Sequence, residues 1–309
     1  MSIEEDKQIM DYQEALKRAQ ESQGVAGELE RIGKVRRLRR YPLKSALGEE
    51  LQHAVLTKTG VYGDRAFAVL DRESGKIASA KRPMLWRSLL SLTAQLSEDT
   101  GTLAISLPNG HTIHSNSENI DSALSNLLGR HVSLVSERRP GMQFERSRPE
   151  EVLAHGLDAD VALDVGEIGA AAPEGGFYDF APVHLVTVAS LEEISRKANL
   201  HALEAERYRP NIVIDSSDTT PFIENSWTGQ KLQIGCAVLE IMVPTPRCAV
   251  PTLAHGLGLE PKPDVLRAIH ANNRVDIPDA GTFPCLGVYA KVLHTGEIVP
   301  GDSVLFVDD

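Results

Sequence analysis

Residues Ala237-Val-Leu-Glu-Ile-Met-Val-Pro-Thr-Pro-Arg-Cys-Ala-Val-Pro-Thr252 form an apolar run that passes directly into a loop with three prolines. The run over residues 237–243 predicts a β-strand, because apolar and β-branched residues favour strands. Each proline fixes its own φ and restricts the residue before it, so Arg247 and Cys248 follow the strand on a stiff, irregular backbone. A guanidinium beside a thiol favours the thiolate, which attacks electrophiles and binds soft metals. The sequence therefore marks Cys248 as a candidate functional thiol, with an ordinary loop cysteine as the alternative.

The composition limits the class of protein. The chain has 309 residues, of which 42% are hydrophobic and 24% charged, enough for one large or two ordinary domains. Its formal net charge of -11 argues against a nucleic-acid-binding protein, which would carry a basic surface. The three cysteines, an odd number without close pairs, argue against a disulfide framework and fit a reducing compartment. We expect Cys236 and Cys285 to pack as small apolar groups.

The sequence also lacks the patterns of exported and membrane proteins. Its first residues, Met1-Ser-Ile-Glu-Glu-Asp6, have neither the basic nor the apolar region of a signal peptide. No run approaches the roughly twenty apolar residues that cross a bilayer. We therefore expect no membrane partner and a cytoplasmic location.

Many short strands separated by turn residues predict a β-rich α+β fold rather than a doubly wound sheet. The expected helices lie at residues 120–128, closed by Gly129, at residues 190–199 and at residues 264–270. The second begins with Ser190-Leu-Glu-Glu193, which matches a capping box. The expected strands lie at residues 34–38, 77–80, 89–96, 103–107, 111–114, 184–188, 208–214, 237–243 and 286–293, with a further β pair at 296–306.

Three parts are expected along the chain. Residues 1–32 are highly charged and predict a helical N-terminal extension. Residues 33–150 form a first, β-rich domain in this division, and residues 151–309 form the second. The stretch 138–176, rich in Gly, Ala, Pro and charge, indicates a loose connection between them.

Four basic residues stand beside turns or strand ends in this acidic protein, namely Lys44, Arg65, Arg209 and Arg247. Arginine binds phosphate bidentately, and Lys44 with the adjacent Ser45 adds a point charge and a hydroxyl. Backbone groups in Gly- and Pro-rich turns can complete such an anion site. Neither GxGxxG nor a Walker A loop occurs, so nucleotide cofactors have no signature. The pattern therefore favours a pocket for another phosphate-bearing ligand, with surface or capping residues as the alternative.

Five motifs in order extend this pattern: Tyr41-Pro-Leu-Lys-Ser45, Gly63-Asp-Arg65, Arg209-Pro-Asn-Ile-Val213, Asn225-Ser-Trp227 and Arg247-Cys248. Their set and spacing over residues 33–309 resemble the MOSC proteins, relatives of the C-terminal domain of molybdenum cofactor sulfurase. The two-part arrangement is similar to the mitochondrial amidoxime-reducing component and its bacterial relatives. The resemblance implies a β-barrel-like MOSC domain at 151–309, preceded by a smaller MOSC N-terminal β domain at 33–150.

The resemblance also implies a bound molybdenum cofactor, a pyranopterin whose dithiolene holds the metal. Cys248 falls on the position of the family's catalytic thiolate ligand to molybdenum. Six further residues fall on positions that surround the pterin and its phosphate, namely Lys44, Ser45, Arg65, Arg209, Asn211 and Arg247. His184 lies at a matching place, but a histidine at the edge of the core is the favoured interpretation there.

Two functions remain open. The first is an oxidoreductase that reduces N-hydroxylated or related small molecules, with electrons from a separate reductase or ferredoxin, because no C-terminal cysteine cluster supplies a ferredoxin domain. The second is a cofactor carrier or sulfur-transfer protein with a persulfide on Cys248. A Schiff base between Lys44 and pyridoxal phosphate is disfavoured, since a lysine at an exposed turn lacks a desolvating pocket.

Overall fold

The computed structural model describes residues 30–156, 158–278 and 280–307. The expected helical extension over residues 1–32 lies outside the described residues, except at its last positions. There the prediction is wrong, because Arg31 already begins the first strand, β1 (Arg31–Arg40). Ile32, Val35 and Leu38 of this strand are buried in the largest apolar cluster, and a register shift between Val35 and Arg37 interrupts its alternation.

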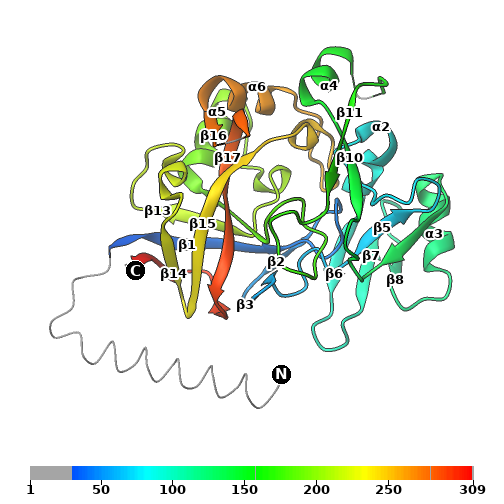
Figure 1. Cartoon of the computed structure of the whole chain (residues 1–309), viewed down its shortest axis with the longest axis horizontal. Helices are drawn as coiled ribbons and strands as arrows, with labels where there is room; N and C mark the ends of the chain where they lie inside the picture. The colour runs from blue at the N-terminus through cyan, green and yellow to red at the C-terminus, as the bar shows by residue number, and fades with distance from the viewer. Residues whose placement is uncertain (1–29, 157, 279, 308–309) are drawn as a thin grey trace.

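A closed barrel of seven strands is the main element of the fold (Figure 1). Its strands follow the order β12-β13-β1-β19-β14-β15-β17, and a β12–β17 pairing closes the ring. Only the β12–β13 pair in this ring is parallel. The bounds of the other strands are β12 (Val183–Thr187), β13 (Ile212–Ser216), β14 (Lys231–Ile234), β15 (Ala237–Pro246), β17 (Gly281–His294) and β19 (Ser303–Val307).

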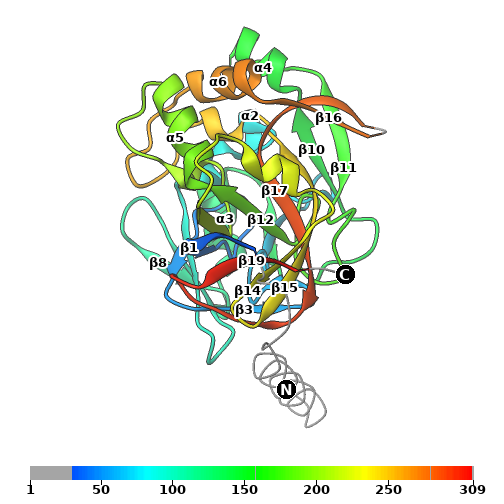
Figure 2. The ribbon, with the colours of Figure 1, turned by 90° about the vertical axis from the view of Figure 1, so that its left-hand side faces the viewer.

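Two helices pack on the outer side of the barrel, the first on β12 and β13 and the second on β17 (Figure 2). They are α5 (Val188–Lys197) and α6 (Asp264–Asn272), and their apolar residues form a cluster with Val186 and Val213. All five residues of β12 are buried, because one face of the strand looks into the barrel and the other meets these helices. A strand buried on both faces reads as a continuous apolar run, as the run over 184–188 does.

A smaller β-rich part lies beside the barrel and holds a second apolar cluster (Figure 1). Its helix α3 (Ile120–Leu128) ends at Gly129 with a φ of 65°, which confirms the predicted stop. The predicted hairpin at 103–114 is also confirmed, within a sheet of three strands. The strands of this part are β5 (Ala68–Asp71), β6 (Thr93–Leu96), β7 (Leu103–Ser106), β8 (Thr112–His114) and β9 (Val132–Val135), whereas β2 (Glu49–Leu51), β3 (Ala54–Thr57) and β4 (Gly60–Val61) contribute their buried residues to the barrel's cluster.

Local patterns misplaced several elements. Residues 77–80 form no strand, and Ile77 makes only two isolated bridges, to Leu70 and Phe144. Residues 89–91 belong to a 3-10 helix, η1 (Arg87–Ser91), after α2 (Pro83–Trp86). The expected pair at 296–306 is wrong, because β18 (Gly296–Ile298) pairs with β3 whereas β19 pairs with β1 and β14. The stretch 138–176 is more ordered than expected, with β10 (Gln143–Ser147), α4 (Pro149–His155) and β11 (Leu163–Glu167). The domain boundary at 150 stays a prediction.

The N-cap of α5 is Thr187, not Ser190. Strand β12 runs into the helix without a loop, so the last extended residue becomes the cap, and the Thr187 hydroxyl accepts a hydrogen bond from the Ser190 amide at 3.2 Å. The hydroxyls of Thr187 and Ser190 both donate to the buried carboxylate of Glu224, at 2.8 and 2.7 Å. Glu224 lies on η3 (Ile223–Trp227), and it joins the 225–227 motif to the end of β12. The other short elements are η2 (Ala205–Arg207), η4 (Val250–Thr252) and β16 (Arg274–Ile277).

Candidate functional site

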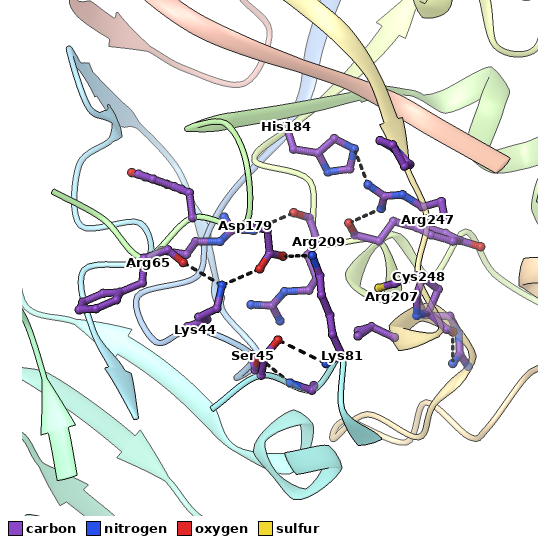
Figure 3. Close-up of a pocket in the computed structure, with 18 of the residues that line it drawn as sticks. Lys44, Ser45, Arg65, Lys81, Asp179, His184, Arg207, Arg209, Arg247 and Cys248 are labelled. Carbon is purple, nitrogen blue, oxygen red and sulfur yellow. Dashed lines mark hydrogen bonds and ion pairs between the residues drawn. The ribbon is translucent and has the colours of Figure 1, made fainter. Parts of the chain in front are cut away.

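One pocket brings together all seven residues that the sequence marked (Figure 3). It encloses about 800 Å³ of space, including solvent at its open side. The seven lining residues are Lys44, Ser45, Arg65, Arg209, Asn211, Arg247 and Cys248. They come from loops that follow β1, precede β5, precede β13 and follow β15, so both halves of the chain contribute.

Backbone hydrogen bonds align the two loops from the first half. The Lys44 amide donates to the Phe67 carbonyl at 2.9 Å, and the Arg65 amide donates to the Tyr41 carbonyl at 2.8 Å. Leu43 and Phe67 form an isolated parallel bridge between them. The 41–45 and 63–65 motifs, which the sequence separates, are therefore neighbours along one wall of the pocket.

Three of the pocket residues have left-handed backbone conformations. The φ angles of Ser45, Arg65 and Arg209 are 67°, 50° and 59°. A side chain in this region costs roughly 1–3 kcal/mol at each position, and such strain persists where surrounding structure fixes it. The Ser45 hydroxyl accepts from the Ala80 amide at 3.0 Å, and the Arg65 carbonyl accepts from the Phe177 amide at 2.7 Å. Backbone strain at three residues that line one pocket is typical of a functional site.

Arg65 and Arg209 both stack on the buried ring of Tyr41. Their guanidinium carbons lie 4.6 and 4.4 Å from the ring centroid, within the range of a cation–π contact. Burial, and then the charge of Arg65, lowers the pKa of Arg209 to about 10. Arg209 Nη1 donates to the Ala46 carbonyl at 2.6 Å, whereas its buried Nη2 has no partner among the described residues. The pocket therefore presents a donor that an anion would satisfy.

Asn211 has a scaffolding role beside its place in the pocket wall. Its side-chain oxygen accepts from the His184 amide at 3.1 Å, and its side-chain nitrogen donates to the Arg39 carbonyl at 3.3 Å. These bonds join β12, β1 and the start of β13 at one end of the barrel. Asn211 is buried, and its amide group is largely used by the protein itself.

Lys44 forms an ion pair that the sequence did not suggest. Its ammonium lies 2.6 Å from Asp179 and donates to the Phe177 carbonyl at 3.0 Å, while Lys81 lies 3.1 Å from the other oxygen of Asp179 (Figure 3). Both lysines also lie over the Phe144 ring. The expectation of an exposed Lys44 is wrong, because its side chain is 4% exposed.

The charges of this cluster are strongly coupled. Burial lowers the pKa of Lys44 to about 8, and Asp179 opposes that shift. Burial acts to raise the pKa of Asp179, but Lys44 and Lys81 outweigh it and hold that pKa well below its usual range. Lys81 and Asp179 were missed because no proline or glycine directly adjoins either residue. Their only signal is a charged residue adjoining an apolar or aromatic one.

The proline-rich loop places Arg247 against His184. Arg247 Nη1 donates to the Tyr208 carbonyl at 2.9 Å, and Nη2 lies 3.5 Å from His184 Nε2. Burial, followed by the charge of Arg247, holds the pKa of His184 well below its usual value. His184 is therefore a neutral, buried histidine that also lines the pocket.

The three thiols differ in environment. Cys248 is half-buried in the pocket wall, and Cys285 is buried, with its pKa raised to about 11 by that burial. Cys285 thus packs as predicted, but Cys236 is exposed, and the same prediction is wrong for it. The described ranges contain no group of three or more His, Cys, Asp and Glu side chains that could hold a metal by themselves.

Family models identify the class of protein that this barrel and pocket define. The MOSC N-terminal beta barrel domain matches residues 32–138, and the MOSC domain matches residues 173–305. The chain therefore belongs to the MOSC family. The matches start one residue after β1 begins and end inside β19, so they span the described barrel.

Relatives with similar sequences extend over most of the chain. Mitochondrial amidoxime-reducing component 1 of Homo sapiens is 25% identical, over 89% of this chain and 83% of the relative. Mitochondrial amidoxime reducing component 2 of Homo sapiens is 23% identical, over 89% and 84%. Among solved structures, the YUAD protein from Bacillus subtilis is 11% identical over 90% of this chain and 97% of that chain, with a TM-score of 0.39.

Together, the family and these relatives support a function related to the molybdenum cofactor. No helix in the described ranges is long and apolar enough to cross a membrane. The relatives named above are mitochondrial, and the cytoplasmic location expected for this chain stays a prediction.

Proposed function

We propose that the chain binds the molybdenum cofactor in this pocket and reduces N-hydroxylated or related N-oxygenated small molecules. The electrons come from a separate donor protein. The observation that carries the proposal is the unpartnered, buried Nη2 of Arg209, which faces a strained, cationic pocket that also contains Cys248. The names of the two human relatives, which describe amidoxime reduction, support the substrate class, because an amidoxime is an N-hydroxylated amidine.

The charges of the pocket fit an anionic cofactor. Its lining cations are Lys44, Arg65, Lys81, Arg207, Arg209 and Arg247, and its lining carboxylate is Asp179. Arg65 has its own partner in Asp64, so the uncompensated charge lies mainly on the lysine pair and on Arg209 and Arg247. A phosphate would bind Arg209 Nη2 and the Lys44 ammonium through charge-assisted hydrogen bonds, with the Ser45 hydroxyl beside them.

The donor set at the other end of the pocket fits a sulfur-ligated metal. Cys248 offers a soft ligand, and a pterin dithiolene would supply the further sulfurs that the described protein groups do not. When bound, the cofactor supplies the redox chemistry that breaks the N–O bond. Arg247 is held by the Tyr208 and Thr245 carbonyls, so its charge lies at a fixed position in the pocket wall.

The overall reaction needs two electrons and two protons for each N–O bond. The nitrogen keeps its bond to carbon and gains a hydrogen, and the oxygen leaves as water. His184 is neutral in this setting, and Lys44, whose pKa burial lowers to about 8, is the more acidic of the two pocket lysines. The electrons enter from a reductase or ferredoxin in the proposed reaction, or from a reduced dye in an assay.

The test is to produce the chain in a host that makes the cofactor and to measure molybdenum and pterin per protein. We expect near-stoichiometric amounts of both, and reduction of an aromatic amidoxime to the amidine with a reduced viologen dye as donor. Protein without metal or pterin from a demonstrably competent host would refute the proposal. Loaded protein that reduces no N-hydroxylated compound, but releases cyanide-labile sulfur from Cys248, would favour a carrier or sulfur-transfer function instead.

A further inference from the structure

Arg207 is a buried arginine that no sequence motif marked. Its side chain is 2% exposed, and it lies on η2, two positions before Arg209. Each of its guanidinium nitrogens has a partner: Nε pairs with Glu204, Nη1 donates to the carbonyls of Pro251 and Leu253 at 3.4 and 3.2 Å, and Nη2 donates to the Glu260 carbonyl at 2.7 Å. This full set of bonds distinguishes Arg207 from Arg209, whose Nη2 has none.

The carbonyls that Arg207 binds all belong to the loop that follows Cys248. The loop closes on itself through the Lys262 amide, which donates to the Thr252 carbonyl at 2.8 Å, and through a bridge between His255 and Leu259. The loop backbone thus surrounds the guanidinium. Without Arg207, the carbonyls of Pro251 and Glu260 would lose their side-chain donor, and the Leu253 carbonyl would keep only its contact with the His255 ring. Carbonyls held away from water are costly to leave unpaired.

Leu253 connects this bonding to the thiol. Its carbonyl accepts from Arg207, and its side chain is part of the apolar cluster with Ala80, Leu90 and Val250. Cys248 packs against that same cluster. Fixing the Leu253 backbone therefore fixes one side of the surface on which Cys248 rests.

The residue after Arg207 holds the chain on the other side of the thiol. The Tyr208 carbonyl accepts from Arg247 Nη1 at 2.9 Å, and Arg247 directly precedes Cys248. Glu204, with a left-handed φ of 41°, compensates the charge of Arg207. Arg207 is thus charge-paired and fully bonded, which suits a geometric role better than anion binding.

We propose that Arg207 is a positioning residue, which holds the thiol of Cys248 at the pocket by bonding the loop that follows it. The role rests on the proposed function only in its use of Cys248. Its test uses the cofactor-free protein, so its failure is distinguishable from a failure to bind molybdenum.

The experiment compares Arg207→Gln and Arg207→Lys with the unchanged protein. Alkylation of each cysteine by iodoacetamide is followed by mass spectrometry, and hydrogen exchange is followed over residues 248–262. We expect Arg207→Gln to speed alkylation of Cys248 by about tenfold or more, because at least one buried hydrogen bond to a charged group is lost. Hydrogen exchange over residues 248–262 should become faster in the same variant, and Cys285 should stay protected from alkylation. Arg207→Lys keeps the charge without the planar fork and should rescue part of the effect.

Arg196→Gln is the matched control, because Arg196 is an exposed arginine at the end of α5 that also bonds a glutamate three residues away. It should change neither alkylation nor exchange. Unchanged Cys248 alkylation and loop exchange in Arg207→Gln would overturn the proposal. An equal rise in the alkylation rates of Cys248 and Cys285 would also overturn it, because such a rise indicates general loss of the fold. If Arg207→Gln does not fold, Arg207→Lys is measured instead and judged by the same two outcomes.

Discussion

Lys44 Nζ lies 2.6 Å from Asp179 Oδ1, although 135 positions separate the two residues in the chain. The pair spans the pocket from the loop after β1 to the segment before β12, and Lys81 binds the second oxygen of the same carboxylate. An anionic ligand that binds Lys44 must compete with Asp179 for the ammonium. The pocket therefore contains its own counter-ion, and its affinity for anions depends on the protonation of Lys44.

The first prediction concerns the pH dependence of anion binding. With a pKa of about 8, Lys44 loses its charge in the cofactor-free protein as the pH rises through that value. A charge-assisted hydrogen bond is worth roughly 1.5–3 kcal/mol, so phosphate affinity should fall by about ten- to a hundredfold between neutral pH and pH well above 8. Titration calorimetry of the cofactor-free protein with inorganic phosphate measures this fall.

Lys44→Arg supplies the control for that measurement. Arginine keeps its charge over the same range, so the steep fall should be absent, and any residual slope reports the titration of phosphate itself. Parallel pH profiles in the two proteins would contradict the assignment of Lys44 to the anion site.

The second prediction concerns acid stability. The pKa of Asp179 is held below its unfolded value of about 3.9, so the charged carboxylate stabilises the folded state above that pH, and this contribution is lost as the pH falls through the folded pKa. Asp179→Asn should lower the free energy of unfolding at pH 7 by roughly 1–2 kcal/mol, a figure reduced for screening because the side chain is 35% exposed.

Urea unfolding at pH 7 and near pH 3 measures the difference between the two proteins. The cost of Asp179→Asn should shrink at the lower pH, because the Asp179 carboxyl of the unfolded chain is then largely protonated while that of the folded chain is still charged. Asp158→Asn, at an exposed surface ion pair, should cost little at either pH. If Asp179→Asn lowers the free energy of unfolding by the same amount at both pH values, the ion pairs with Lys44 and Lys81 are not the source of the loss.

Local patterns determine individual elements here better than they determine partners. The helix that ends at Gly129 follows from residues adjacent in the sequence, because glycine adopts the left-handed conformation at a helix stop. The place of β1 between β13 and β19 joins the two ends of the chain, and the pairing of β18 with β3 is equally remote. No local signal encodes such pairings, so the closed barrel could be expected only from the resemblance of ordered motifs.

The same distinction holds within the site. Arg209 and Arg247 stand beside prolines, and that stiff context marked them. Lys81, Asp179 and Arg207 also line the pocket, but no proline directly adjoins them in the sequence. Their roles depend on burial and on partners far along the chain, such as Glu260 for Arg207, which only the fold determines.

The third prediction concerns Arg209. Arg209→Ala removes the unpartnered Nη2 donor and the stack on Tyr41, so cofactor retention should weaken by about ten- to a hundredfold, which corresponds to roughly 1.5–3 kcal/mol for a charged hydrogen bond. Pterin content after repeated dilution and filtration measures retention, and a thermal melt of the cofactor-free protein checks the fold. Arg267→Ala, at an exposed position on α6, is the control. Full retention in Arg209→Ala would mean that the phosphate lies elsewhere.

The fourth prediction separates catalysis by Cys248 from sulfur transfer. Cys248→Ser replaces a soft ligand with a hard oxygen at a half-buried position, so the pterin should still bind through the cationic wall, while amidoxime reduction with a viologen dye should be lost. Pterin content and turnover are measured on the same preparation, with Cys236→Ser, at an exposed thiol, as the control. In the loaded, unchanged protein, Cys248 should resist alkylation because the metal holds it, whereas a persulfide carrier must keep this sulfur accessible and labile to cyanide. Substantial reduction by Cys248→Ser would exclude the thiol from the reaction, even if the cofactor were bound.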